Sequence, residues 1–242
     1  TAVGDLALFT SNGGGGDNNI AMGTFSGGYM AGNRNVILGV EAFKGGFGGD
    51  YDHRGNDNIF IGYQSAINAT GNTNNQNIFI GSTTGASLRD GANNILIGYN
   101  LDVSSGTAAN ELNIGNAIFG DLSTGNIGIA NTSPDVALDV TGDIEYTGTL
   151  TDVSDRRLKT DITPLKADDM INRIANVDTY TFRMKDDEKG QIEYGVMAQE
   201  IEKIFPELVR TADDEMGTKS VNYVGLIAPM IEATKSLKAE NE

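Results

Sequence analysis

The sequence predicts a mainly β repetitive shaft of the β-roll or β-helix kind, followed by a small α+β domain that ends in a helix. The first observation is a change of composition at Ser154: residues up to Val153 hold 28 glycines, 4 Lys+Arg and 15 Asp+Glu, whereas the rest hold 4, 13 and 18. So abrupt a change marks a domain boundary. The second is an apolar tetrad that recurs in the first half, and the third is helical apolar spacing near the end. We expect a shaft at 1–130, a neck at 131–153 and a second domain at 154–242.

The repeat is a short apolar run that usually opens with Asn and closes on Gly. Such β-branched runs, bounded by Gly, Asn, Asp and Ser, are typical of strands separated by turns. Degenerate copies follow at 112–115 and 126–129, and the closing glycines up to the first of these are spaced 16, 23, 19, 17 and 17 residues apart. The five clear copies are Asn19-Ile-Ala-Met-Gly23, Asn35-Val-Ile-Leu-Gly39, Asn58-Ile-Phe-Ile-Gly62, Asn77-Ile-Phe-Ile-Gly81 and Asn94-Ile-Leu-Ile-Gly98.

Each repeat is too short to bury its own apolar face, so we expect each strand to stack on the same strand of the next copy, as in a solenoid. The closing glycine would let the backbone turn through positive φ, and the opening Asn suits a turn or an inward ladder. The pattern resembles the head repeats of trimeric bacterial adhesins and the shafts of phage fibres, which implies a trimeric shaft. An ordinary antiparallel sandwich is the alternative.

Polar inserts between the repeats are expected to project from the shaft. The longest, at 44–53, contains His53, the single histidine of the chain. Projecting loops are where recognition residues tend to sit, so these loops are the candidates for contact with a host cell-surface receptor or a glycan. In the neck, 133–144 alternates apolar and polar residues, as one strand and a turn do.

Charge and composition exclude several classes of function. The formal net charge of -16 repels phosphate backbones and anionic headgroups, so no nucleic-acid partner is expected. No run approaches the roughly 18 to 20 apolar residues of a bilayer span, so membrane insertion is not expected either. There is no cysteine, the acidic turns match no calcium loop, and neither a metal nor another cofactor is expected. A polysaccharide-degrading shaft lacks support, because no paired carboxylates stand out from these turns.

The second half reads as a mixture of helices and strands. We expect helices at 167–175 and 197–204, strands at 178–184 and 191–196 joined by a charged turn, and a short strand at 220–223. The last segment, from about Val224, places Leu226, Met230, Ala233 and Leu237 at steps of 4, 3 and 4. This is coiled-coil spacing, and a single amphipathic helix packed on its own domain explains it equally well.

Residues 154–242 contain five short blocks in a fixed order: Ser154-Asp-Arg-Arg-Leu-Lys-Thr-Asp-Ile162, Tyr194-Gly-Val-Met-Ala-Gln-Glu-Ile-Glu202, Phe205-Pro-Glu-Leu-Val209, Val221-Asn-Tyr223 and the closing 226–237. Together they resemble the C-terminal intramolecular chaperone of phage tailspikes, tail fibres and endosialidases, a self-cleaving module that also occurs in the myelin regulatory factor. The resemblance implies a homotrimeric assembly factor that helps an upstream β fibre to fold and is then released by cutting its own chain. It implies a place in the virion tail, with the chaperone released after assembly in the host cytoplasm. Two features depart from the family pattern: the chain ends soon after Leu237, so the terminal helix is expected to be truncated, and this half has no histidine.

The resemblance also implies the chemistry. The bond cut would join Val153 to Ser154, with Ser154 as nucleophile and Lys159 as general base of a serine endopeptidase that acts once, on its own chain. A serine hydroxyl is a weak nucleophile without a neighbouring base. A lysine can be that base only where burial or nearby cations bring its pKa well below about 10.4, and Arg156 and Arg157 are candidates for such cations.

Three further side chains are candidates for supporting the site. Asp155 is placed to orient Lys159 or to pair with an arginine, and a capping or solvated carboxylate is at least as consistent with its position. Gln199 and Glu200 lie in a family-like block. We expect them to act first as determinants of helix and fold, and second as supports of the site.

The spacing of Ser154 and Lys159 constrains how they can meet. Residues five apart lie about 140° from each other on a helix and on opposite faces of a strand. Either Ser154 therefore lies in an extended or turned segment that leads into Lys159, or Lys159 reaches a Ser154 of a neighbouring chain. We expect trimer formation to complete the site. The alternative function is a structural trimeric adhesin or fibre whose tail domain trimerises and never cuts.

Overall fold

The computed structural model describes residues 1–8, 16–45, 55–71, 73–185 and 190–242. The chain divides into two compact units, Thr1–Thr147 and Gly148–Glu242. Most of the insert at 44–53, with His53, lies outside the described residues.

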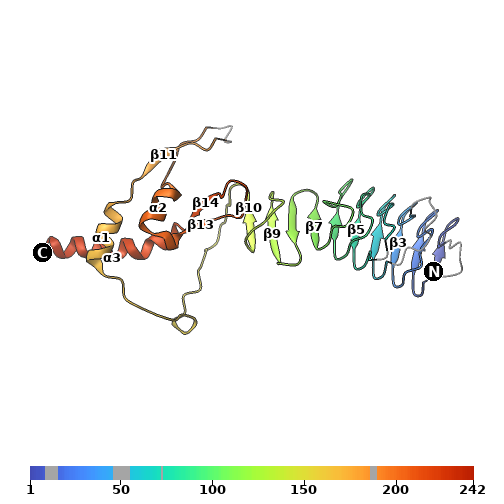
Figure 1. Cartoon of the computed structure of the whole chain (residues 1–242), viewed down its shortest axis with the longest axis horizontal. Coiled ribbons are helices and arrows are strands. Elements are labelled where there is room, and N and C mark those ends of the chain that lie inside the picture. The colour runs from blue at the N-terminus through green and yellow to red at the C-terminus, as the bar shows by residue number, and fades with distance from the viewer. Residues whose placement is uncertain (9–15, 46–54, 72, 186–189) are drawn as a thin grey trace. The chain divides into compact units, whose positions relative to one another are not determined.

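The first unit is a β-solenoid of about 6 turns. Its strands follow one another in chain order within one sheet, and β1 to β7 are parallel, so each strand stacks on the next (Figure 1). This confirms the repetitive shaft and rules out the antiparallel sandwich. The parallel strands are β1 (Ala2–Val3), β2 (Ile20–Met22), β3 (Val36–Leu38), β4 (Ile59–Ile61), β5 (Ile78–Ile80), β6 (Ile95–Ile97) and β7 (Glu111–Ile114).

The register of these strands sets equivalent residues of successive repeats in line. Phe60, the central residue of β4, pairs with Ile37 of β3 on one side and Phe79 of β5 on the other. All three central residues are buried, whereas the residue on either side of each is not. Successive side chains of a strand point to opposite faces, so the central residues enter the core and their neighbours face outward.

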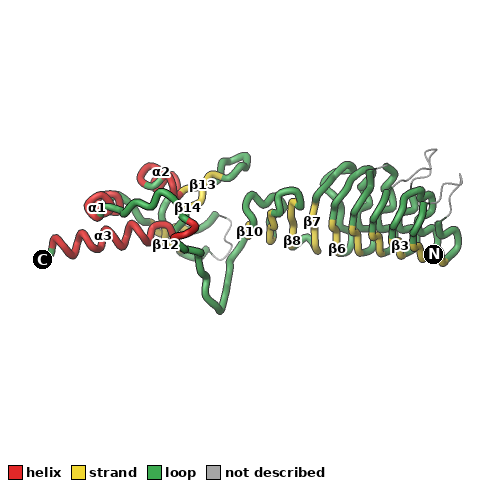
Figure 2. The backbone as a smooth tube through the Cα atoms, turned by 90° about the horizontal axis from the view of Figure 1, so that it is seen from below, coloured by secondary structure: helices red, strands yellow, loops and turns green. Residues whose placement is uncertain are grey.

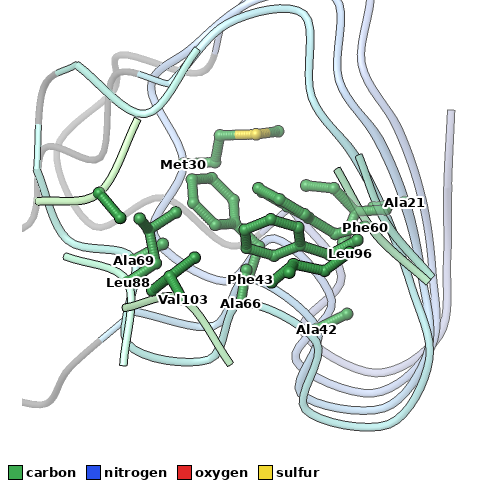
Figure 3. Packing of buried hydrophobic residues seen from close by; sticks show 13 residues of the cluster. Ala21, Met30, Ala42, Phe43, Phe60, Ala66, Ala69, Leu88, Leu96 and Val103 are labelled. Carbon is green, nitrogen blue, oxygen red and sulfur yellow. The ribbon is translucent and has the colours of Figure 1, made fainter. Parts of the chain in front are cut away.

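Aromatic and aliphatic side chains fill the solenoid. The rings of Phe43, Phe60 and Phe79 lie in a row, with centroids 5.0 Å and 5.3 Å apart. Leu88 and Val103 pack into the same cluster and lie together at its other side in Figure 3. Apolar side chains from the strands and from the opposite side of each turn thus fill one continuous core inside the solenoid.

A ladder of buried asparagines runs beside this apolar core. Oδ1 of Asn58 accepts hydrogen bonds from the backbone N–H and from Nδ2 of Asn77, at 2.9 Å and 3.2 Å. Nδ2 of Asn58 in turn donates to Oδ1 of Asn35 and to the carbonyl oxygen of Asn74. The same pattern links the asparagines that open each clear repeat, which confirms the inward ladder. They are Asn19, Asn35, Asn58, Asn77 and Asn94.

The glycine that closes each repeat is required by both backbone conformation and space. Gly81 has φ +138°, and a Cβ there would overlap the carbonyl oxygen of Gly98 in the next turn. Gly62 is related to Gly81 in the same way. The predicted passage through positive φ is confirmed, and the close approach of neighbouring turns is a second reason for glycine.

The solenoid ends where the chain reverses after β7. A turn at Gly115 and Asn116, both with positive φ, leads into β8 (Ile118–Asp121), which is antiparallel to β7. The predicted repeat at 126–129 forms β9 (Asn126–Ile129), but it pairs antiparallel with β8 and is not a turn of the solenoid. The tight turn explains the difference, because it leaves no residues for another loop. In the neck, β10 (Leu138–Val140) pairs parallel with β9.

The second unit combines three α-helices with two small antiparallel sheets, which confirms the α+β prediction for the described residues. Helix α3 is preceded by a 3₁₀ turn, η3 (Val224–Leu226), and α2 is followed by another, η2 (Pro206–Leu208). The strand at β13 was not predicted. The elements are α1 (Ala167–Ala175), β11 (Tyr180–Phe182), β12 (Glu193–Gly195), α2 (Ala198–Ile204), β13 (Val209–Thr211), β14 (Lys219–Val221) and α3 (Ile227–Glu240).

Helix α3 packs along α1 (Figure 2), and several of its apolar side chains stay exposed. Ala233 and Ser236 are buried, and the Ser236 hydroxyl donates to a carboxylate oxygen of Asp168 on α1 at 3.3 Å. Met230 and Leu237 are 54% and 50% exposed. The predicted seam is therefore split: Leu226 and Ala233 are buried in the helix's own domain, whereas Met230 and Leu237 are half-exposed.

Candidate active site

Ser154 and Lys159 meet within one chain. Between them, Arg156–Leu158 form one 3₁₀ turn, η1, and Lys159 returns to an extended conformation with φ -117° and ψ 145°. Nζ of Lys159 donates a hydrogen bond to Oγ of Ser154 at 2.7 Å. Of the two arrangements that the spacing allows, the turned segment is the one that the structure has.

Asp155 holds this turn closed. Its Oδ1 accepts a hydrogen bond from the backbone N–H of Arg157 at 2.9 Å, which caps η1, and its Oδ2 forms an ion pair with Nη2 of Arg157 at 2.6 Å. A side-chain acceptor at this position satisfies a backbone donor that the short helix leaves free. Asp155 therefore takes two of its predicted roles: it pairs with an arginine, Arg157, and it caps the turn.

The ion pair shifts the pKa values of both partners. The side-chain hydrogen bonds from Arg157, and then its backbone N–H, hold the pKa of the Asp155 carboxyl below its usual value. The same contact raises the pKa of the Arg157 guanidinium. Both groups thus carry full charge at neutral pH, and the charge of Arg157 is directed at Asp155.

The peptide bond before Ser154 is open to solvent. Val153 is 82% exposed, and Ser154 and Lys159 are also exposed. The arrangement supplies a hydroxyl, an amine in contact with it, and a carbonyl carbon that belongs to the exposed preceding residue. These are the groups that nucleophilic attack on the chain's own backbone needs.

The remaining predicted residues lie elsewhere or contact other groups. Arg156 is exposed, and among the described residues no side-chain partner is found for it. Gln199 is exposed on α2. Glu200, on the same helix, accepts a hydrogen bond from the hydroxyl of Tyr180 at 3.0 Å, and this bond raises the pKa of Tyr180. Glu200 therefore links α2 to β11.

Two residues that sequence reasoning did not single out connect parts of this unit. Arg173 of α1 lies over the ring of Phe205, 4.0 Å from its centroid, and donates to the carbonyl oxygen of Ile204 at the end of α2. The hydroxyl of Tyr223 accepts a hydrogen bond from the backbone N–H of Val196 at 3.2 Å. Tyr223 thus joins two of the five sequence blocks, and their fixed order was the only signal for this contact.

Neither a metal site nor a membrane-spanning helix is found in the part of the chain that the structure describes. No group of three or more His, Cys, Asp or Glu side chains there is close enough to hold an ion. None of the helices in those residues has the length and apolar character that crossing a bilayer requires.

Comparison with known protein families finds a match within the second unit. Residues 154–210 match the family model described as "Chaperone of endosialidase" (Peptidase_S74). The match begins at Ser154 and includes η1, α1, α2 and the hairpin between the two helices. Peptidase_S74 is a family of self-cleaving peptidase domains. The C-terminal part of this chain is thus a chaperone domain of the kind found in tailspikes and endosialidases.

Proposed function

We propose that this chain is the C-terminal part of a phage tail fibre or tailspike, whose chaperone domain drives homotrimeric folding and then releases itself by cutting between Val153 and Ser154. The observation that carries this proposal is the 2.7 Å contact between Nζ of Lys159 and Oγ of Ser154, at the residue where the family match begins. The chaperone domain would leave the shaft after assembly in the host cytoplasm, and the shaft would remain in the virion tail.

The reaction would proceed in two stages. Oγ of Ser154 attacks the carbonyl carbon of Val153 while Nζ of Lys159 takes the hydroxyl proton. The C–N bond then breaks, the amine of Ser154 takes that proton from Lys159, and an ester joins Val153 to Oγ of Ser154. Water hydrolyses the ester, which leaves a carboxylate on Val153 and restores the Ser154 hydroxyl.

The attack needs a neutral amine at Lys159, and trimer assembly would favour this neutral form. An amine accepts a proton from serine only where its charged form is disfavoured, which burial achieves. In the single chain, Lys159 and Ser154 are exposed. We propose that neighbouring copies cover the pair in the trimer, so that cleavage follows correct assembly.

The uncovered side of α3 supports assembly through this unit. Four aliphatic side chains at helical spacing lie on it, each 50–54% exposed: Ile227, Met230, Ile231 and Leu237. A helix that is apolar on two sides is suited to pack on its own domain with one and on another helix with the second. Copies of this chain would meet through this second side.

Gel mobility of the refolded chain tests the proposal. We expect the wild type to yield fragments of 153 and 89 residues, which together make up the 242 residues of the chain. Ser154→Ala and Lys159→Ala should stay whole, and Lys166→Ala, which removes another exposed lysine of the same segment, should still be cut. A wild type that remains intact would favour the alternative, a structural fibre with a passive trimerisation domain.

A dilution series tests the link to assembly. Because the site is proposed to be completed by neighbouring copies, the onset of cleavage should be delayed as the refolding chain is diluted. Cleavage with a first-order, concentration-independent onset in a population shown to be monomeric would contradict this part of the proposal and leave the Ser154 and Lys159 chemistry standing.

The shaft is the proposed site of host recognition, and one open pocket of about 420 Å³ favours it. Asn68, Thr70, Ser87 and Arg89 line this pocket with amide, hydroxyl and guanidinium groups, which suit a hydroxyl-rich ligand such as a glycan. Binding of acidic and neutral oligosaccharides to wild type and Arg89→Gln would test this. No binding, or binding that Arg89→Gln leaves unchanged, would argue against the pocket.

A further inference from the structure

The outward face of the solenoid sheet is aliphatic at every position over six consecutive strands. The register sets the first residue of each strand in one column and the third in another, with a central residue between them that is buried in β2 to β6. In β7 the second and fourth residues take these places. The strand face consists of Ile20, Val36, Ile59, Ile78, Ile95 and Leu112 in the first column and Met22, Leu38, Ile61, Ile80, Ile97 and Ile114 in the second.

None of these twelve side chains is buried in the single chain. Ile20, Met22 and Ile80 are 43%, 47% and 36% exposed, and the others are half-buried by their neighbours in the columns. Parallel strands lie about 4.8 Å apart, so six of them make a face about 24 Å long. Continuous apolar surfaces of this extent are uncommon on proteins that stay monomeric and usually mark an interface.

The opposite limb of the solenoid has a different chemistry. Ala69 and Leu88 are buried there, and the residues on either side of them, including Asn68 and Ser87, are exposed and polar. Figure 2 shows the strands of the shaft in line on one side and the loops on the other. The aliphatic character therefore belongs to the strand face specifically, and it is not a general property of the shaft surface.

We propose that the strand face packs against the strand faces of other copies of this chain, so that the shafts, as well as the C-terminal units, hold the homotrimer together. This inference rests on the homotrimer proposed above and names the surface through which the shafts meet.

Charge and repetition favour copies of this chain as the occupant. The chain has a net charge of -16, so two copies repel each other wherever their charged surfaces meet. The strand face has no ionisable side chain in either column, so copies can approach there without bringing like charges together. Identical copies also have the same strand spacing, so that their aliphatic columns match strand by strand.

Single cysteines test the contact directly, because the chain contains no other. Ile78→Cys and Ile80→Cys place a thiol in each column, and Ser87→Cys places one on the opposite limb as the matched control. After mild oxidation of the whole chain, we expect a disulfide-linked dimer on a non-reducing gel from at least one strand-face variant, and none from Ser87→Cys. Three chains with one thiol each can form only one disulfide, so at most two chains of every three should be linked.

A charge at the same place tests whether the face is needed for assembly. Ile78→Lys should shift the sedimenting species of the whole chain from trimer towards monomer, because three buried ammonium groups would oppose association. Ser87→Lys should leave the trimer unchanged. Circular dichroism would establish that both variants keep the β signal of the shaft.

The outcomes separate this inference from the proposed function. A trimeric wild type whose strand-face thiols do not link, and which tolerates Ile78→Lys, would overturn the inference and leave the homotrimer standing. A wild type that sediments as a monomer would overturn both, and cleavage at Ser154 would be read separately on a reducing gel. A monomer that floats with neutral lipid vesicles would assign the strand face to a lipid surface, against the inference.

Discussion

Asp155 and Arg157 form a 2.6 Å ion pair inside the turn that brings Lys159 to Ser154. The same carboxylate caps the turn through the backbone N–H of Arg157. Among the described residues, the Asp155 carboxylate thus contacts Arg157 and neither the Ser154 hydroxyl nor the Lys159 amine.

The first prediction is that loss of Asp155 slows cleavage without removing the nucleophile or the base. A misplacement of about 1 Å can cost about 10²-fold in rate, so Asp155→Ala should lower the first-order rate of fragment formation by about this factor. Asp155→Asn keeps an acceptor for the cap and should lie in between. Arg157→Ala combined with Asp155→Ala should cost no more than Asp155→Ala alone; independent, additive effects would contradict the shared role.

The second prediction concerns the protonation of Asp155. Because hydrogen bonds from the Arg157 side chain are the main cause of its lowered pKa, Arg157→Ala should raise the pKa of Asp155 towards the usual value of about 3.9. The folded pKa is lowered, so the carboxylate stabilises the turn above about pH 4 and loses this effect as the pH falls through the folded value. Carboxyl ¹³C shifts, followed by NMR in the uncut Lys159→Ala background, would measure it. An Asp155 titration that Arg157→Ala does not move would refute the assignment.

The third prediction is that the buried asparagine ladder does not tolerate a carboxylate. Asn58→Asp has nearly the same shape but loses the two side-chain donors to Asn35 and to the Asn74 carbonyl. A buried polar group left without its partner costs about 1–3 kcal/mol, and a buried charge costs more. Asn131→Asp is the matched control, because Asn131 uses only its oxygen, as acceptor from Ser133. Denaturant unfolding should show a lower midpoint for Asn58→Asp alone.

The fourth prediction separates two reasons for glycine. Gly81 and Gly142 have similar φ values, +138° and +132°, but no heavy atom lies within 4 Å of a Cβ built at Gly142. Gly142→Ala should therefore cost only backbone strain of about 1–3 kcal/mol. Gly81→Ala adds the overlap with Gly98 and should lower the melting temperature of the shaft by clearly more. Equal losses from the two variants would show that the close approach of the turns is unimportant.

The repeats made the shaft predictable, because strand alternation and the spacing of the Asn and Gly residues determine which side chains enter the core. The pattern failed at 126–129, where Asn126 and Ile127 match the repeat but Gly115 and Asn116 have already turned the chain back. Apolar periodicity carries no information about such a reversal, which depends on two residues with positive φ. The strand Val209–Thr211 was missed because it belongs neither to a repeat nor to a longer alternating run.

For the site, the resemblance supplied Ser154 and Lys159, and their spacing left two arrangements open. The choice between them depends on η1, a single turn whose cap is Asp155. A cap of this kind looks the same in sequence as a solvated carboxylate, so sequence alone could not settle it. Tyr223 and Val196 are 27 residues apart, and contacts at such distances have no local signature.

The reversal after β7 has a consequence for the length of the rod. Because β8 occupies the free edge of β7, no further strand can be added at that point, and the hairpin acts as a stop. Turns inserted or deleted upstream would leave this stop and the second unit untouched. Lineages that carry this architecture could therefore lengthen or shorten the shaft by whole turns without changing the C-terminal unit.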